Sequence, residues 1–112
     1  MPKTQTLEQT KLSEPKMYKV ILLNDDVTTM DFVIEILMNI FHQNLEKASQ
    51  TMLEIHHNGS GICGIYTQEI ALSKQKKVMD AAKLANFPLQ AKVEEEWNTK
   101  KIYKNILIMP KI

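Results

Sequence analysis

The feature that most constrains this chain is the run MYKVILL at residues 17–23, which is rich in β-branched and aliphatic residues and is followed by Asn24-Asp25-Asp26. The run is too short to be an independent helix, and it ends at turn-forming residues. This pattern predicts a buried β-strand with a polar turn directly after it. With 112 residues in all, the chain has room for one domain.

Two predicted helices follow the strand. Thr28, with Asp31 three positions later, forms a variant of the capping box and predicts the start of the first helix. Asn44 as N-cap and Gly59 just past the last turn predict the second helix. Apolar residues at helical spacing give the first helix one broad inner face: Phe32, Val33, Ile36, Leu37, Ile40 and Phe41.

The chain then continues with a strand, a helix and a strand. Residues 61–66 (GICGIY) predict the second strand, in which Gly61 and Gly64 indicate a bulge or a close backbone neighbour. Thr67 predicts the N-cap of a third helix over residues 68–85. Its narrow, alanine-rich inner face contains Ile70, Val78, Ala81, Ala82 and Ala85. Leu89, Ala91 and Val93 alternate with polar residues and predict a half-solvated third strand.

The predicted order is therefore β-α-α-β-α-β, an α+β domain with a three-stranded antiparallel sheet packed against three helices. Residues 1–16 are too polar to bury much surface and are interpreted as a flexible N-terminal arm. Residues 17–96 form the domain. Residues 97–112 are a tail with four lysines, no acidic residue and an apolar run at 106–109. This tail is compatible with an added strand, a cover for a sheet edge or a partner-binding segment.

Composition excludes several classes of function. The formal net charge is +1, and all 14 basic residues are lysines. Balanced charge without arginine argues against binding to nucleic acid or to an anionic membrane surface. One cysteine excludes an internal disulfide and a multi-cysteine zinc site, and it fits a reduced, cytoplasmic location. We find no secretory h-region at the start and no apolar stretch long enough for a membrane helix.

Few residues are candidates for chemistry, because the chain has no Gly-rich phosphate loop, no G-x-S-x-G and no HExxH. Cys63 lies in a predicted strand and is interpreted as buried and inert. His42, His56 and His57 can in principle join Asp25 and Asp26 around a metal. Adjacent histidines on a helix point about 100° apart, however, so His56 and His57 are poorly placed to share one ion. We therefore predict no metal site.

The turn Asn24-Asp25-Asp26 has two interpretations. Asn and Asp commonly form such turns by bonding to their own backbone. Two carboxylates and an amide at the end of a strand, beside a helix start, also suit a binding site. His56 follows Met52 by four positions and shares its helix face. Met30, Met38 and Met52 fit either core packing or an adaptable apolar pocket.

These segments together resemble a known family. MYKVILLNDDVTTMDFVIEIL, ASQTMLEIHHNGSGICGIYTQEIA and FPLQAKVEEE are similar to ClpS, the adaptor of the bacterial Clp ATPase–protease. The specific combination is a strand ending in NDD, then T-x-M-[DE]-F-V, with M-x-x-I/V-H about 22 residues after the first methionine. The resemblance covers residues 17–96. Thr29 stands where the family usually has proline, a change that a first-turn helix position tolerates. The tail after Glu96 is longer than the family leads us to expect.

The resemblance implies a fold similar to the C-terminal domain of the ribosomal stalk protein, and a function without catalysis or cofactor. ClpS-like proteins bind substrates with a destabilising first residue (Leu, Phe, Tyr or Trp) and deliver them to the ClpA ATPase for degradation by ClpP. By position, Asn24, Asp25 and His56 match the residues that hold the substrate's α-amino group. Glu69 and Lys74 match positions that touch the N-domain of the ATPase, and residues 1–16 match the arm used in delivery. The side-chain pocket is matched by Leu22, Thr28, Met30, Val33, Met52, Ile55 and Leu89.

Two other classes of function remain open at this point. The stalk-like fold is compatible with a small RNA- or ribosome-associated domain, against which the missing arginines and balanced charge argue. Asp25, Asp26 and His56 are compatible with a metal-dependent hydrolase. Metal analysis and the salt dependence of RNA binding distinguish these classes from a monomeric peptide-binding adaptor.

Overall fold

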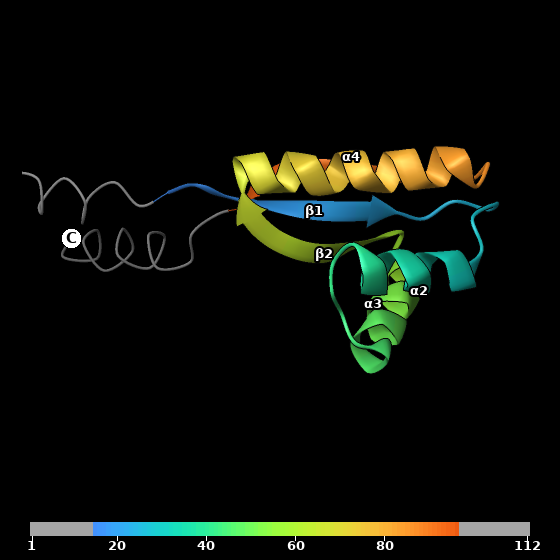
Figure 1. Cartoon of the computed structure of the whole chain (residues 1–112). Coiled ribbons are helices and arrows are strands. Elements are labelled where there is room, and N and C mark those ends of the chain that lie inside the picture. The colour runs from blue at the N-terminus through green and yellow to red at the C-terminus, as the bar shows by residue number, and fades with distance from the viewer. Residues whose placement is uncertain (1–14, 97–112) are drawn as a thin grey trace, which may run out of the picture.

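The computed structural model describes residues 15–96, and their elements follow the predicted order (Figure 1). The strands are β1 (Met17–Leu23), β2 (Ser60–Thr67) and β3 (Gln90–Glu96). The helices are α2 (Met30–Asn39), α3 (Leu45–Asn58) and α4 (Gln68–Leu84). The predicted α+β class is confirmed. The tail and all but the last two residues of the predicted arm lie outside the described residues.

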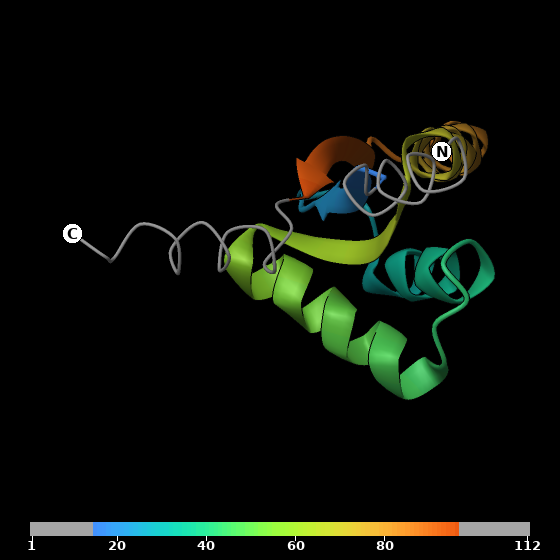
Figure 2. The same ribbon diagram turned by 90° about the vertical axis from the view of Figure 1, so that its left-hand side faces the viewer.

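The sheet is antiparallel, with β1 in the centre and the order β2-β1-β3. α4 and α2 lie against one side of this sheet, and α3 packs against α2 and β2 (Figure 2). Val20 and Leu22 of the central strand face these helices and are fully buried, which explains the aliphatic composition of β1. The predicted irregularity of β2 is also confirmed, because its register with β1 shifts between Val20 and Ile21.

One predicted helix start is wrong by a residue. The N-cap of α2 is Thr29, whose hydroxyl accepts a hydrogen bond from the Phe32 amide at 3.2 Å. Thr28 does not cap the helix, and its amide and its hydroxyl both donate to the Asp25 carboxylate. The ends of α3 agree with the prediction, since Asn44 caps its start and Gly59 adopts a left-handed conformation (φ 88°) at its end.

The predicted inner face of α4 is also partly wrong. Ala71, Val78 and Ala82 are its buried residues, whereas Ile70 is 48% exposed and Ala85 is exposed. Ile70 lies one position from Ala71, about 100° around the helix. The small side chain of Ala71 therefore faces the sheet, where the helix approaches closely, and the larger isoleucine faces outward.

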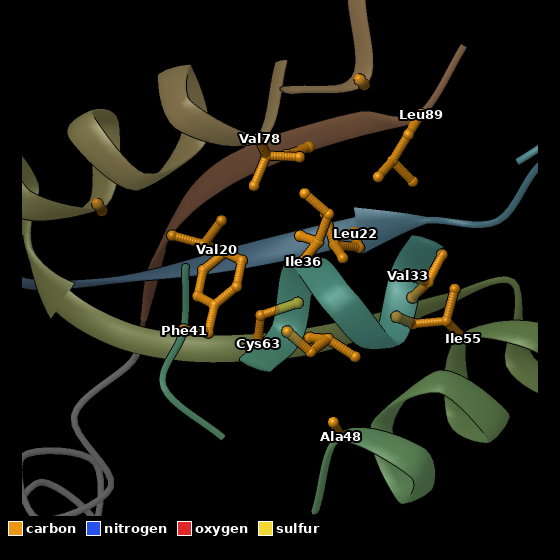
Figure 3. Close-up of a cluster of buried hydrophobic side chains, with 14 residues drawn as sticks. Val20, Leu22, Val33, Ile36, Phe41, Ala48, Ile55, Cys63, Val78 and Leu89 are labelled. Carbon is orange, nitrogen blue, oxygen red and sulfur yellow. The ribbon is translucent and has the colours of Figure 1, made fainter. Parts of the chain in front are cut away.

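The core lies between the sheet and the helices (Figure 3). Its fully buried large side chains are Val20, Leu22, Leu37 and Val78. Cys63 belongs to this core, and burial raises the pKa of its thiol to about 12. A thiol in that state is not a nucleophile at neutral pH, which agrees with the interpretation of Cys63 as an inert core residue.

Candidate functional site

The candidate site begins where β1 ends. The backbone N–H of Asn24 donates to the carbonyl of Gly59 at 2.9 Å, and the Gly59 N–H in turn donates to the carbonyl of Ile55 at 2.9 Å. These two bonds attach the polar turn after β1 to the last turn of α3. The Asn24 side chain is exposed, and so is His56, three positions before Gly59. The fold therefore brings the strand end that carries Asn24 to the helix end that carries His56, although 31 residues lie between them in the sequence.

Asp25 organises the loop between β1 and α2. Its Oδ1 accepts hydrogen bonds from the backbone amides of Val27 (2.8 Å) and Thr28 (2.6 Å), and its Oδ2 accepts one from the Thr28 hydroxyl (2.7 Å). Partial burial acts to raise the pKa of the Asp25 carboxyl, but the three hydrogen bonds outweigh it and the net pKa is lowered. Asp25 is therefore a well-oriented carboxylate that is charged at neutral pH.

This carboxylate has no cation to neutralise it among residues 15–96. The ion pairs found there are Lys76–Asp80 and Lys92–Glu94, on α4 and β3. The segment from Val20 to Glu46, both included, contains five acidic residues and no lysine or arginine. The surroundings of Asp25 are thus electrostatically suited to a positively charged ligand and unsuited to a phosphate backbone.

The last turns of α3 combine an apolar inner side with an exposed histidine. Ile55 is buried, Met52 is half-buried and His56 is exposed. The helix lies so close to β2 that a Cβ added to Gly61 would come within 2.7 Å of Ile55 Cγ1. This close contact sets the distance between α3 and β2, and hence the position of the turn that carries His56.

The residues predicted to line a side-chain pocket fall into two groups. Leu22, Val33, Ile55 and Leu89 come from four segments of the chain and are at most 7% exposed. Figure 3 shows them toward the end of the core where β1 ends. Thr28, Met30 and Met52 are more accessible, and Met30 is 46% exposed. The buried group can form the floor of an apolar site, with the accessible group at its rim.

The structure does not support the alternative metal site. His42 lies in the turn after α2, whereas Asp25 precedes the start of this helix, which is about 15 Å long. Within residues 15–96 no group of three His, Cys, Asp or Glu side chains is arranged to hold a metal ion. None of the helices described is long and apolar enough to cross a membrane.

Comparison with known proteins now identifies the family. A family model described as ATP-dependent Clp protease adaptor protein ClpS matches residues 13–92. The chain belongs to the ClpS family. ClpS proteins from two Campylobacter jejuni strains are 99% identical to it over 96 residues, which are 86% of this chain and the whole of each relative. The ClpS of Maricaulis maris is 50% identical over 83% of this chain and 84% of its own length.

A solved ClpS structure supports the fold. The structure of Agrobacterium tumefaciens ClpS2 bound to L-phenylalaninamide superposes with a TM-score of 0.72 and 37% sequence identity. The match covers 74% of this chain and 100% of that one. The family is thus one of adaptor proteins of the Clp protease.

The positions that the ClpS resemblance assigned to the ATPase lie on α4. Glu69 is exposed in the first turn of this helix. Lys74 is half-buried, and its Nζ donates to the carbonyl of Ile40 at 2.6 Å and lies 5.7 Å from the centre of the Tyr66 ring. Lys74 therefore holds the C-terminal end of α2, at the opposite end of that helix from Met30.

One contributor to the site was missed by sequence reasoning. The ring of Phe87 packs on that of Phe32 with centroids 4.9 Å apart, and Asn86 before it has a left-handed backbone (φ 62°). This contact joins α2 to the loop that leads to Leu89. The signal in the sequence was Asn86, a residue type that tolerates the left-handed region, followed two positions later by Pro88.

Proposed function

We propose that this protein binds substrates with a bulky hydrophobic first residue, Leu, Phe, Tyr or Trp, and delivers them to a ClpA-type AAA+ ATPase for degradation by the ClpAP protease. It acts as a monomeric, cytoplasmic adaptor that uses no cofactor and catalyses no reaction. Its membership in the ClpS family supports the general role, and the residues around β1 and α3 support the ligand.

The observation that carries the proposal is the state of Asp25. Its carboxylate is oriented by three uncharged donors, and no lysine in the described part of the chain pairs with it. The α-ammonium group of a free N-terminus has three N–H donors and one positive charge. Asp25 supplies the charged acceptor, and the Asn24 carbonyl and a ring nitrogen of His56 supply the other two. A blocked or internal peptide nitrogen has neither the charge nor the donors.

The apolar end of the core would receive the first side chain. Leu22, Val33, Ile55 and Leu89 are the floor, and Met30 and Met52 are at the rim. The phenylalaninamide in the Agrobacterium ClpS2 structure has the same features, a free amine beside an aromatic side chain. Burial of such a side chain stabilises a complex by about 1.5–3 kcal/mol. Each polar contact to the charged amine contributes about as much again, so tight binding requires both parts.

A separate surface would serve delivery. Glu69 on α4 is exposed and free to contact the ATPase N-domain, and residues 1–16 are proposed to engage the ATPase as an arm. Because Lys74 holds the end of α2, part of any delivery defect after its substitution would come from the fold. Glu69→Ala is therefore the sharper test of ATPase binding. Glu46→Ala, at an exposed first-turn position of α3, is the matched control.

The amine hypothesis is tested by titrating labelled peptides that differ only at the first residue, each with and without N-acetylation. Free peptides that begin with Leu or Phe should bind at least about tenfold more tightly than their acetylated forms, the minimum for losing one contact to a charge. Asn24→Ala should weaken the free peptide, whereas Asn39→Ala, at the exposed end of α2, should not. Equal affinity for free and acetylated peptides would refute the proposal.

A further inference from the structure

We propose that Thr28 is a positioning residue for amine recognition, because its hydroxyl holds the Asp25 carboxylate with one acceptor position open toward the ligand. The inference rests on the proposed function and adds a specific device to it. Family resemblance had assigned Thr28 only to the side-chain pocket. In the structure its hydroxyl donates to Asp25, 2.7 Å away.

The two oxygens of Asp25 are held in different ways. Oδ1 accepts from the amides of Val27 and Thr28, which are backbone groups that remain whatever the side chains. Each carboxylate oxygen has two lone pairs, so Oδ1 is fully engaged. Oδ2 accepts a single hydrogen bond, from the Thr28 hydroxyl. One lone pair of Oδ2 therefore remains for the ligand, and Thr28 is the only described residue that donates a hydrogen bond to this oxygen.

The hydroxyl is needed because a carboxylate rotates easily. The last torsion of an aspartate side chain is broad and roughly two-fold, and rotation about it moves both oxygens together. The Thr28 hydroxyl restrains this rotation at Oδ2, in addition to the two backbone bonds at Oδ1. Binding then requires less ordering, which is how a preorganised acceptor increases affinity.

Thr28 also has acceptor capacity of its own. A hydroxyl has one proton and two lone pairs. The proton of the half-buried Thr28 hydroxyl is donated to Asp25, so this hydroxyl can only accept a further hydrogen bond. Beside a carboxylate that no lysine in the described chain neutralises, this acceptor adds to the selectivity for a cationic amine.

The neighbouring threonine provides a matched control. Thr29 is in the same loop, and its hydroxyl accepts from the Phe32 amide, without any bond to Asp25. Thr28→Val and Thr29→Val both remove one hydroxyl at nearly constant volume. Thr28→Val removes a hydrogen bond to the Asp25 carboxylate, whereas Thr29→Val removes the hydrogen bond that caps α2.

The experiment measures Kd for a free-amine peptide beginning with Phe and, by carbon-13 NMR, the pKa of the Asp25 carboxyl in the ligand-free protein. Thr28→Val should weaken binding about tenfold, the scale of one contact to a charge, and raise the pKa of Asp25. Thr28→Ser, which keeps a hydroxyl at this position, should retain most of the peptide affinity and most of the lowering of the Asp25 pKa. Thr29→Val should lower the melting temperature and change neither quantity. Thr28→Ala takes the place of Thr28→Val if the latter does not fold.

The outcomes separate this inference from the proposed function. If the unaltered protein binds free and acetylated peptides equally, the proposed function fails, and the inference with it. If it prefers the free amine and Thr28→Val binds with the original affinity, only the positioning role is wrong. An equal loss in Thr28→Val and Thr29→Val would also overturn it, because the effect would then be one of loop stability.

Discussion

Gly61→Ala tests how the close packing of α3 on β2 supports the site. The added Cβ would lie 2.7 Å from Ile55 Cγ1 and 3.6 Å from the Ile55 backbone nitrogen. Two carbons are most stable at about 3.5–4.0 Å, so the pair is about 0.8 Å too close. Ile55 is only 3% exposed, so its side chain has no free space into which to move. We expect the helix to shift and the free energy of unfolding to fall by about 1–3 kcal/mol.

A second substitution shows whether that contact is the cause. Ile55→Ala alone removes Cγ1 and should cost about 2–5 kcal/mol because it leaves a cavity. In the double variant the methyl group introduced by Gly61→Ala occupies part of this cavity. The cost of the double variant should therefore be smaller than the sum of the single costs by about 1 kcal/mol or more. A domain of about 80 residues has about 4–12 kcal/mol of stability, and urea unfolding measures how much of it each variant retains.

The functional consequence follows from what the end of α3 carries. His56 follows Ile55 directly, and the Gly59 carbonyl accepts a hydrogen bond from the Asn24 amide, so a shift of this turn disturbs two of the proposed amine ligands. Gly61→Ala should therefore weaken peptide binding. Val78→Ala, on the buried face of α4, should lower stability with peptide affinity preserved. Additive unfolding free energies, within about 0.5 kcal/mol, or preserved affinity in Gly61→Ala would refute the reasoning.

Three further predictions concern specificity, delivery and acid stability. Met30→Ala should raise the affinity for peptides beginning with Ile or Val relative to Leu, because a shorter side chain opens room near the ligand's Cβ; an unchanged Leu/Ile ratio in peptide titrations contradicts this. Deletion of residues 1–16 should leave peptide affinity intact and abolish degradation of a reporter substrate by ClpAP; loss of peptide binding would argue against a separate arm. The lowered pKa of Asp25 means that its carboxylate stabilises the fold fully above its ordinary value of about 3.9, and that this contribution is lost as the pH falls through the lower folded-state pKa. In acid, unfolding free energies should therefore decline more steeply in the unaltered protein than in Asp25→Asn, and parallel curves would show that Asp25 contributes nothing.

The site was predictable in part. The turn Asn24-Asp25-Asp26 and the face shared by Met52 and His56 are visible in the sequence, because turn residues and helical spacing are local properties. Their roles came from the ClpS resemblance. What Asp25 bonds to was not predictable, because both threonines that follow it are able to cap a helix. In the structure Thr28 donates to the Asp25 carboxylate, and Thr29, one residue later, caps the helix.

Lys74 and Ile70 illustrate the same limit on α4. Helical spacing indicates which residues share a stripe, but the distance to the sheet decides which stripe faces inward, and here the close approach selects Ala71 over Ile70. Lys74 is polar and has no acidic neighbour in the sequence, so the sequence alone predicts a solvent-exposed side chain. The tertiary structure places the end of α2 within its reach, and the carbonyl of Ile40 accepts its hydrogen bond.

The sequence by itself determined the order and nature of the elements of the domain, because strand-forming runs, helical periodicity, caps such as Asn44 and the left-handed Gly59 depend on interactions within a few residues. The tertiary structure decided which elements meet. It joined the end of β1 to the end of α3 through the Asn24–Gly59 hydrogen bond, and it gathered Leu22, Val33, Ile55 and Leu89 at one end of the core. Such contacts link residues far apart in the chain, and they depend on the packing of the whole domain rather than on any local pattern.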